Sequence, residues 1–194
     1  MHRNLTTVSR WMAILGGIVL IALIALMCLS VLGRGLNTFL HNDLMQTSAK
    51  VLADALLATG VGPILGDFEI VEAGIAFAIF AFLPLCQITQ SHATVDVFTA
   101  MMSERINRVL MLLSDALFVG VLALIAWRLW DGMMSKVGNG ETTFLIQFPV
   151  WWGYAACMVP AILAVIVAAY IAVTRLREVA TGHAILPMAA GADH

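Results

Sequence analysis

Long apolar stretches separated by short polar segments dominate the sequence. Four of them are long enough to cross a bilayer, and we expect spans at about 12–32, 68–88, 109–130 and 148–173. About 20 apolar residues in a helix cross the roughly 30 Å of hydrocarbon, and in lipid a helix satisfies its own backbone groups. The sequence therefore predicts an all-α integral membrane protein with four transmembrane helices, forming a single membrane domain over residues 1–194.

Two connecting segments carry a helical pattern of their own. Apolar side chains oppose Lys50 and Asp54 in residues 42–59, and they oppose Asp96 and Glu104 in residues 94–107. Helices with one apolar and one polar face lie in the interface plane of a membrane. We therefore expect two interfacial amphipathic helices, and contact of the Met-rich second segment with a partner protein is an open alternative.

Composition supports lipid as the main surroundings of the chain. Apolar residues make up 61% of the sequence, charged residues make up 11%, and the mean hydropathy is +0.96. A globular domain has roughly 25% charged residues. The formal net charge is −2 and no basic run is present, so nucleic acid is not expected as a partner, because binding it needs clustered Lys and Arg.

The basic residues near the spans predict the orientation. Four spans put both termini and the 89–108 connection on one side, which holds Arg3, Arg10, Arg105, Arg108, Arg175 and Arg177. The other side holds Arg34, Lys50, Arg128 and Lys136. The positive-inside rule then places both termini in the cytoplasm.

Aromatic residues gather at the outer edge of the third and fourth spans. We expect interfacial anchors at Trp127, Trp130, Trp151 and Trp152. Pro149 precedes the last two, and we expect it at the first-turn position of the fourth helix.

Three charged residues near the outer ends of the first two spans need an explanation, since ionisable groups at membrane depth are costly. Glu69 and Glu72 are three residues apart, so they share one helical face. Arg34 leaves the first span at the same level. We expect a structural ion pair between Arg34 and one or both glutamates, and the alternative is that each side chain extends separately to the interface.

Asp115 lies about two turns inside the third span. No basic residue is expected at a matching depth in the other spans. Three interpretations remain open: a proton or cation relay, a group facing another subunit, or a neutral acid bonded to Ser114 and the backbone. The last two are favoured, because one intramembrane carboxylate is weak support for a transport pathway.

Catalytic, metal and cofactor sites are not expected. The five histidines lie outside the spans, the three cysteines form no C-x-x-C pair, and no Gly-rich phosphate loop or nucleophile elbow is present. The sequence therefore predicts a protein that is not an enzyme and has no cofactor.

Several motifs along the chain belong together. The second span has an acidic pair at its start, then Gly74 and Pro84, and it is followed by Gln-Ser-His-Ala-Thr-Val-Asp at residues 90–96. The fourth span has Thr143 before it, Phe-Pro-Val-Trp-Trp at residues 148–152, and then Tyr154 and Pro160. Together with Val31-x-x-Arg34, this order resembles the small membrane subunit of tripartite ATP-independent periplasmic (TRAP) transporters, the DctQ-type family. The connector from Arg34 to Asp67 is longer than is typical of that family.

The resemblance implies a role in a complex. Such subunits pack as a scaffold against a large, many-spanning permease subunit that moves the substrate with sodium across the bacterial inner membrane. A periplasmic binding protein delivers the substrate, often an organic acid. For His92 and Asp96 the resemblance implies an inner-side corner that contacts the large subunit, and helix capping by Thr94 or Asp96 is the alternative.

Other functions stay open from the residues alone. One is the small subunit of a tricarboxylate-type tripartite transporter. Another is a self-sufficient transporter or channel that uses Asp115, Glu69 and Glu72. A third is a membrane anchor for a redox enzyme, which the absence of buried histidines disfavours. No paired half-helices and no inverted repeat are evident, and both are typical of chains that hold their own transport site, so an accessory subunit is favoured.

Overall fold

Five helices account for most of the computed structural model, which describes residues 2–42, 45, 47, 50–58, 60, 62–90 and 104–181. The helices are α1 (His2–Leu40), α3 (Lys50–Ala58), α4 (Asp67–Ile88), α6 (Glu104–Asn139) and α7 (Trp151–Thr181). Four of them, all except α3, are long and apolar enough to cross a membrane. The prediction of an all-α protein with four candidate transmembrane helices is confirmed.

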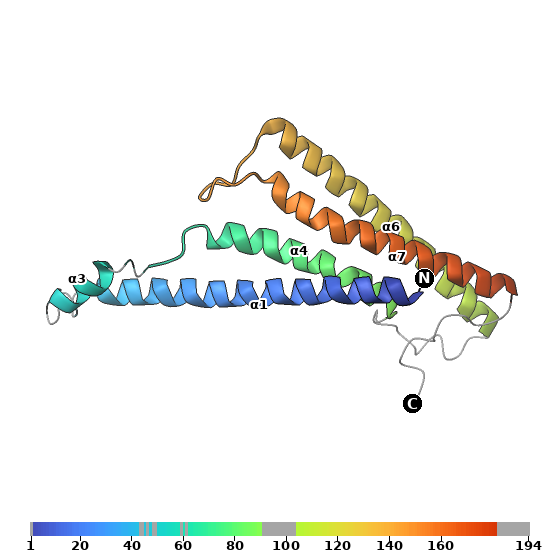
Figure 1. Cartoon of the computed structure of the whole chain (residues 1–194), viewed down its shortest axis with the longest axis horizontal. Helices are drawn as coiled ribbons and strands as arrows, with labels where there is room; N and C mark the ends of the chain where they lie inside the picture. The colour runs from blue at the N-terminus through green and yellow to red at the C-terminus, as the bar shows by residue number, and fades with distance from the viewer. Residues whose placement is uncertain are drawn as a thin grey trace, which may run out of the picture.

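The four long helices form two antiparallel pairs. α1 packs against α4, α6 packs against α7, and α7 joins the pairs by packing on α4. Figure 1 shows that α4 and α7 converge toward one end and diverge toward the other. We call the end with the α6–α7 loop, residues 140–150, the loop end, and the end with the start of α1 the terminal end. The order α1, α4, α7, α6 is a row of helices, with α1 and α6 at its two edges.

The helices are longer than the apolar runs that predict them. At 1.5 Å per residue the 39 residues of α1 span about 58 Å and the 36 residues of α6 about 54 Å, against roughly 30 Å of hydrocarbon. α3 covers the second part of the interfacial helix expected at 42–59. Of the helix expected at 94–107, residues 94–103 lie outside the described residues, and residues 104–107 are the first turn of α6.

Small residues let the helix pairs approach closely, as is usual where both partners stand in lipid. Ala78 and Ala81 of α4 are almost fully buried, and a Cβ atom built on Gly16 of α1 would collide with the Ala81 side chain. In the same way, a Cβ atom on Gly132 of α6 would meet the ring of Tyr154 in α7.

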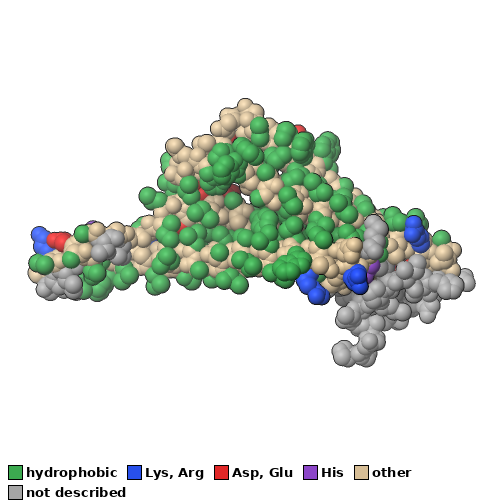
Figure 2. Space-filling model, viewed as in Figure 1, with side chains coloured by type: hydrophobic (Ala, Val, Ile, Leu, Met, Phe, Trp, Pro, Cys, Tyr) green, Lys and Arg blue, Asp and Glu red, His purple; other side chains and the backbone are tan. Residues whose placement is uncertain are grey.

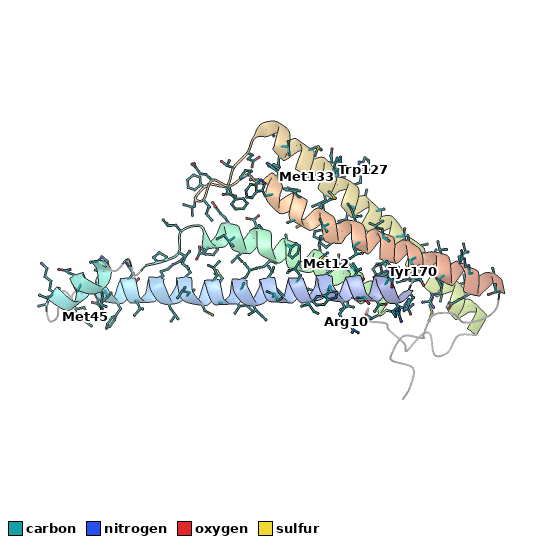
Figure 3. All side chains as sticks on the ribbon, in the orientation of Figure 1. Arg10, Met12, Met45, Trp127, Met133 and Tyr170 are labelled. Carbon is teal, nitrogen blue, oxygen red and sulfur yellow. The ribbon has the colours of Figure 1, made fainter. Side chains whose placement is uncertain are left out.

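α7 is the central helix of the packing. Its residues Val167 and Ile171 form one buried cluster with Ile88 of α4, and Ala164 and Ala168 form a second with Leu122 of α6. Large apolar side chains cover the outside of the molecule (Figure 2). Trp127, for example, points away from the other helices (Figure 3). An apolar outer surface of this kind is expected where lipid or another membrane protein replaces water.

Candidate functional site

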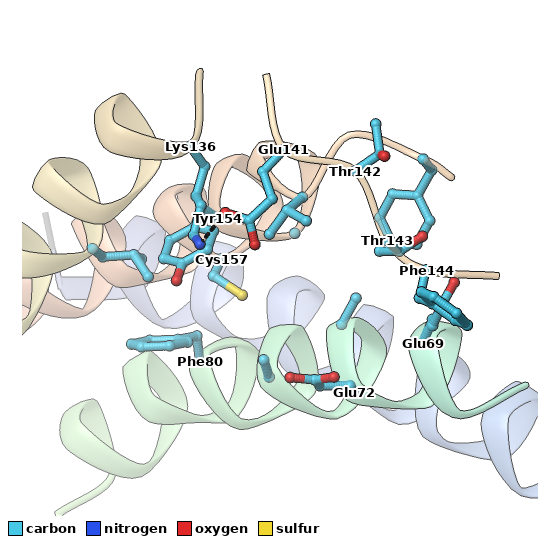
Figure 4. A pocket seen from close by; sticks show the side chains of 16 residues that line it. Glu69, Glu72, Phe80, Lys136, Glu141, Thr142, Thr143, Phe144, Tyr154 and Cys157 are labelled. Atoms are coloured by element: carbon cyan, nitrogen blue, oxygen red, sulfur yellow. Dashed lines mark hydrogen bonds and ion pairs between the residues drawn. The ribbon is translucent and has the colours of Figure 1, made fainter. Parts of the chain in front are cut away.

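A cleft of about 660 Å³ opens at the loop end, between α4 and the hairpin of α6 and α7. We call it the loop-end cleft. Figure 4 shows α4 forming one wall, while α7, α6 and the loop between them form the other. Charged side chains come from both walls: Glu69 and Glu72 from α4, Lys136 from α6 and Glu141 from the loop. The remaining lining is mostly apolar.

The loop that closes the cleft is held in a short hairpin. Thr143 N donates to Phe148 O at 3.0 Å, and Val150 N donates to Glu141 O at 3.0 Å, which makes an isolated antiparallel bridge. Gly140 has a φ of 61°, a left-handed conformation that glycine adopts without strain. The backbone can therefore turn directly at the end of α6.

Glu69 attaches this loop to α4. Its two carboxylate oxygens accept hydrogen bonds from Leu145 N at 2.6 Å and from Ile146 N at 2.9 Å. Bonds from backbone N–H groups to a carboxylate are stronger than bonds between neutral groups. The contact joins residues 76 and 77 positions apart, so Glu69 fixes the loop across the mouth of the cleft.

The other charged residues of the cleft differ in whether another residue of the chain binds them. Lys136 Nζ donates to Glu141 Oε2 across the cleft wall, and the Tyr154 ring stands beside this pair (Figure 4). Glu72 also faces the cleft, but among the described residues no hydrogen bond or ion pair to its carboxylate is found. Glu72 is therefore the carboxylate in this cleft that the packing of the chain does not use.

Arg34 lies near a different acidic residue from those expected. Its Nη2 is 3.6 Å from Asp67 Oδ2, and its guanidinium lies over the ring of Phe68. The structure does not bring Arg34 to Glu69 or Glu72. Asp67 is only 3% exposed and also accepts a hydrogen bond from Ser30 Oγ of α1.

Ser30 and Asp67 thus join α1 to the start of α4. Ser30 Oγ in turn accepts a bond from Ile64 N at 3.2 Å, so a single hydroxyl connects both helices and the chain before α4. Asp67 is not among the predicted site residues, because the apolar pattern starts the second span one residue later. Its place in the first turn of that helix was the available signal, since acidic residues favour helix N-termini.

Asp115 has a basic partner, and the expectation that none lies at its depth is wrong. Arg175 Nε donates to Asp115 Oδ2 at 3.1 Å, and Arg175 Nη1 lies 3.6 Å from Glu178 Oε2. The apolar pattern ends the fourth span at residue 173, before Arg175, whereas α7 continues to Thr181. The neutral form bonded to Ser114 is therefore replaced by an ion pair that joins α6 to α7.

The geometry of the antiparallel hairpin explains this pair. Asp115 lies as many residues before Asn139, the end of α6, as Arg175 lies after Trp151, the start of α7. Residues at equal distances from the turn face one another in antiparallel helices of equal rise.

The expected anchors lie at the surface. The four tryptophans at positions 127, 130, 151 and 152 are all exposed in the isolated chain. Pro149 lies two residues before the start of α7, where it pairs with Thr142, and is not the first residue of the helix. His92 and Asp96 lie outside the described residues.

The two charged sites are separate. Buried apolar residues of α4, α6 and α7, among them Leu122, Ala164 and Val167, lie between the loop-end cleft and the Asp115–Arg175–Glu178 cluster. Within residues 2–90 and 104–181, apart from the undescribed positions, no group of three or more His, Cys, Asp or Glu could hold a metal ion. The charged residues of these two sites therefore connect helices, and those at the loop end also line an open cleft.

One family model matches most of the chain. It is described as the DctQ component of tripartite ATP-independent periplasmic transporters, and it covers residues 47–178. That range includes the loop-end cleft, α4, α6 and nearly all of α7. No curated protein and no solved structure matches the chain.

Proposed function

The chain belongs to the DctQ family of TRAP transporter components, and on that premise we propose that it is the scaffold subunit on which a large permease subunit of the same transporter is assembled. Its partners in this proposal are that many-spanning subunit, a periplasmic substrate-binding protein and membrane lipid. The transporter imports an organic acid with sodium, and the sodium and substrate sites belong to the large subunit.

The continuity of the four long helices supports an accessory role most directly. Chains that hold their own transport site commonly bring broken helices together at the middle of the membrane. Here α1, α4, α6 and α7 each run unbroken through the described residues, and prolines 84 and 160 lie inside continuous helices. The charged groups sit toward the two ends, with apolar packing between them.

The row of helices also supports a scaffold. α1 and α6 lie at the edges of the row, and both present long apolar surfaces. A large subunit can pack along such a surface, and in lipid the association is favoured by close packing of small residues. A rigid row of helices that packs against the static part of the transporter widens that part in the membrane and supports the part that moves.

In the proposed orientation both termini are cytoplasmic and the loop end is periplasmic. The excess of arginine at the terminal end supports this. The exposed tryptophans and Pro149 near the loop end then anchor the subunit at the periplasmic interface. His92 and Asp96 are proposed to order the cytoplasmic turn and to contact the large subunit, and a transport defect of Asp96→Asn without loss of stability would support that contact.

Uptake by reconstituted vesicles tests the proposal. Vesicles that contain only this chain, with a sodium gradient, should accumulate no organic acid. Adding the large subunit of the same transporter, together with the binding protein, should restore uptake, and omitting this chain should remove it. Sodium-driven uptake by this chain alone would overturn the accessory role.

A further inference from the structure

The lining of the loop-end cleft changes from charged to apolar with depth. Glu69 and Glu72 line the part nearest the start of α4, which we call its mouth, and Phe80 lies about 12 Å farther along this helix (Figure 4). Lys136 and Glu141 face α4 from the opposite wall, and Leu129 also contributes to the lining. At 1.5 Å per residue, Phe80 lies about 20 Å along α4 from its first residue. The apolar part of the cleft therefore lies farther along α4 from the loop end than the two carboxylates of this helix do.

The size of the cleft suits a small molecule. Its volume of about 660 Å³ falls within the roughly 300–1,000 Å³ that is typical of ligand sites. The divergence of α4 and α7 toward the loop end leaves a hollow between the two helix pairs, which is visible in Figure 2. A molecule that enters from the surrounding lipid can therefore reach the cleft.

Two charged groups of the cleft retain unused bonding capacity. Glu72 has no hydrogen bond or ion pair within the described part of the chain, so its exposed carboxylate can accept from a cation. Lys136 has three N–H donors, and the structure shows a bond from it to Glu141. The Thr143 hydroxyl oxygen is also buried without a hydrogen bond of normal geometry. The cleft thus offers an acceptor for a cation on α4 and donors for an anion on the opposite wall.

We propose that the loop-end cleft binds one phospholipid with a primary-amine headgroup. The ammonium group donates to Glu72, the phosphate accepts from Lys136, and an acyl chain lies along Phe80 and Leu129. A choline headgroup has no N–H to donate to the carboxylate. An anionic headgroup brings a net negative charge into a cleft with three carboxylates and one lysine. This inference depends only on the membrane location, and not on the proposed subunit role.

Native mass spectrometry of the full-length chain provides the test. The chain is first purified together with the lipids that it binds in the membrane, and these lipids are identified. After delipidation the protein is titrated separately with phosphatidylethanolamine, phosphatidylcholine and phosphatidylglycerol. We expect phosphatidylethanolamine to bind about tenfold more tightly than the other two, the effect of one hydrogen bond between charged groups. Glu72→Gln should abolish this preference, and Asp131→Asn, on an exposed carboxylate away from the cleft, should leave it unchanged.

A steric variant provides an independent check. Ala76→Leu adds volume to the cleft lining without changing charge, so it should weaken the binding of all three lipids. Equal affinity of the wild type for the three lipids would overturn the proposal, as would an unchanged preference in Glu72→Gln. A basic side chain of a neighbouring protein that cross-links to Glu72 in the intact complex, with no amine lipid bound there, would overturn it as well.

Discussion

The guanidinium of Arg175 on α7 donates to the carboxylate of Asp115 on α6 at 3.1 Å, where both side chains are largely buried. The same guanidinium lies beside Glu178, one turn farther along α7. A charge pair at this depth fixes the register of two helices, because sliding either helix by one turn strands the charges in apolar surroundings. The Asp115–Arg175 pair thus joins α6 and α7 at one end of their hairpin, and the hydrogen bonds of the α6–α7 loop join them at the other end.

Removing the arginine should be strongly destabilising. We expect Arg175→Gln to lower the free energy of unfolding by about 3–5 kcal/mol, the usual effect of leaving a buried charge without its partner. Thermal unfolding in detergent measures this. Arg177→Gln is the matched control, since Arg177 is exposed on the same helix, and equal effects of the two substitutions would contradict the assignment.

Close packing of α1 on α4 predicts different outcomes at two neighbouring glycines. Gly16→Leu should separate the helices and cost about 1–3 kcal/mol, because its side chain meets Ala81. Gly17→Leu should be tolerated, because nothing lies within 4 Å of a Cβ atom at that position. The two substitutions change helix propensity equally, so the difference between their unfolding midpoints isolates packing. The reverse order would show that another face of α1 meets α4.

The junction of α1 and α4 should depend more on Ser30 than on Arg34. Ser30→Ala removes the hydroxyl that donates to the buried Asp67 carboxylate and accepts from Ile64 N, at a cost of about 1–3 kcal/mol, although the Phe68 N–H still donates to Asp67. Arg34 is half exposed, so Arg34→Gln should cost less than about 1 kcal/mol. Thermal unfolding of both variants checks the order. A larger loss for Arg34→Gln would mean that the ion pair, and not the hydroxyl, holds the junction.

Glu69 should control the mobility of the loop between α6 and α7. Glu69→Ala removes the acceptors of Leu145 N and Ile146 N, so hydrogen exchange at these two amides should become faster. Glu72→Ala, one turn along the same helix, should leave their exchange unchanged. Protection that persists in Glu69→Ala would mean that the bridge of Thr142 and Pro149 alone orders the loop.

The helices could be predicted from the sequence because lipid imposes a simple rule. Each apolar run must form a helix of sufficient length, and the runs at 12–32, 68–88, 109–130 and 148–173 each lie within or largely within an observed helix. The ends were less predictable, since α1 and α6 continue through polar residues that packing and local hydrogen bonds keep helical. Pro149 illustrates this, because pairing with Thr142 delays the start of α7.

The pairing of charges was harder to predict than the spans. The sequence predicts a pair of Glu69 and Arg34 because both lie at one level of the membrane, but this level does not determine which helix face a side chain occupies. The structure turns Glu69 toward the α6–α7 loop and places Asp67 beside Arg34. The Asp115–Arg175 pair follows from equal distances to one turn, but only with the observed ends at Asn139 and Trp151, which the apolar runs do not give.

Isolation of the tagged chain from its native membranes, followed by mass spectrometry of the proteins that accompany it, tests the central claim most directly. The scaffold role predicts that a much larger, many-spanning protein travels with it in equal amount, with the periplasmic binding protein present when substrate is supplied. A chain that purifies alone, or only with copies of itself, would contradict that role.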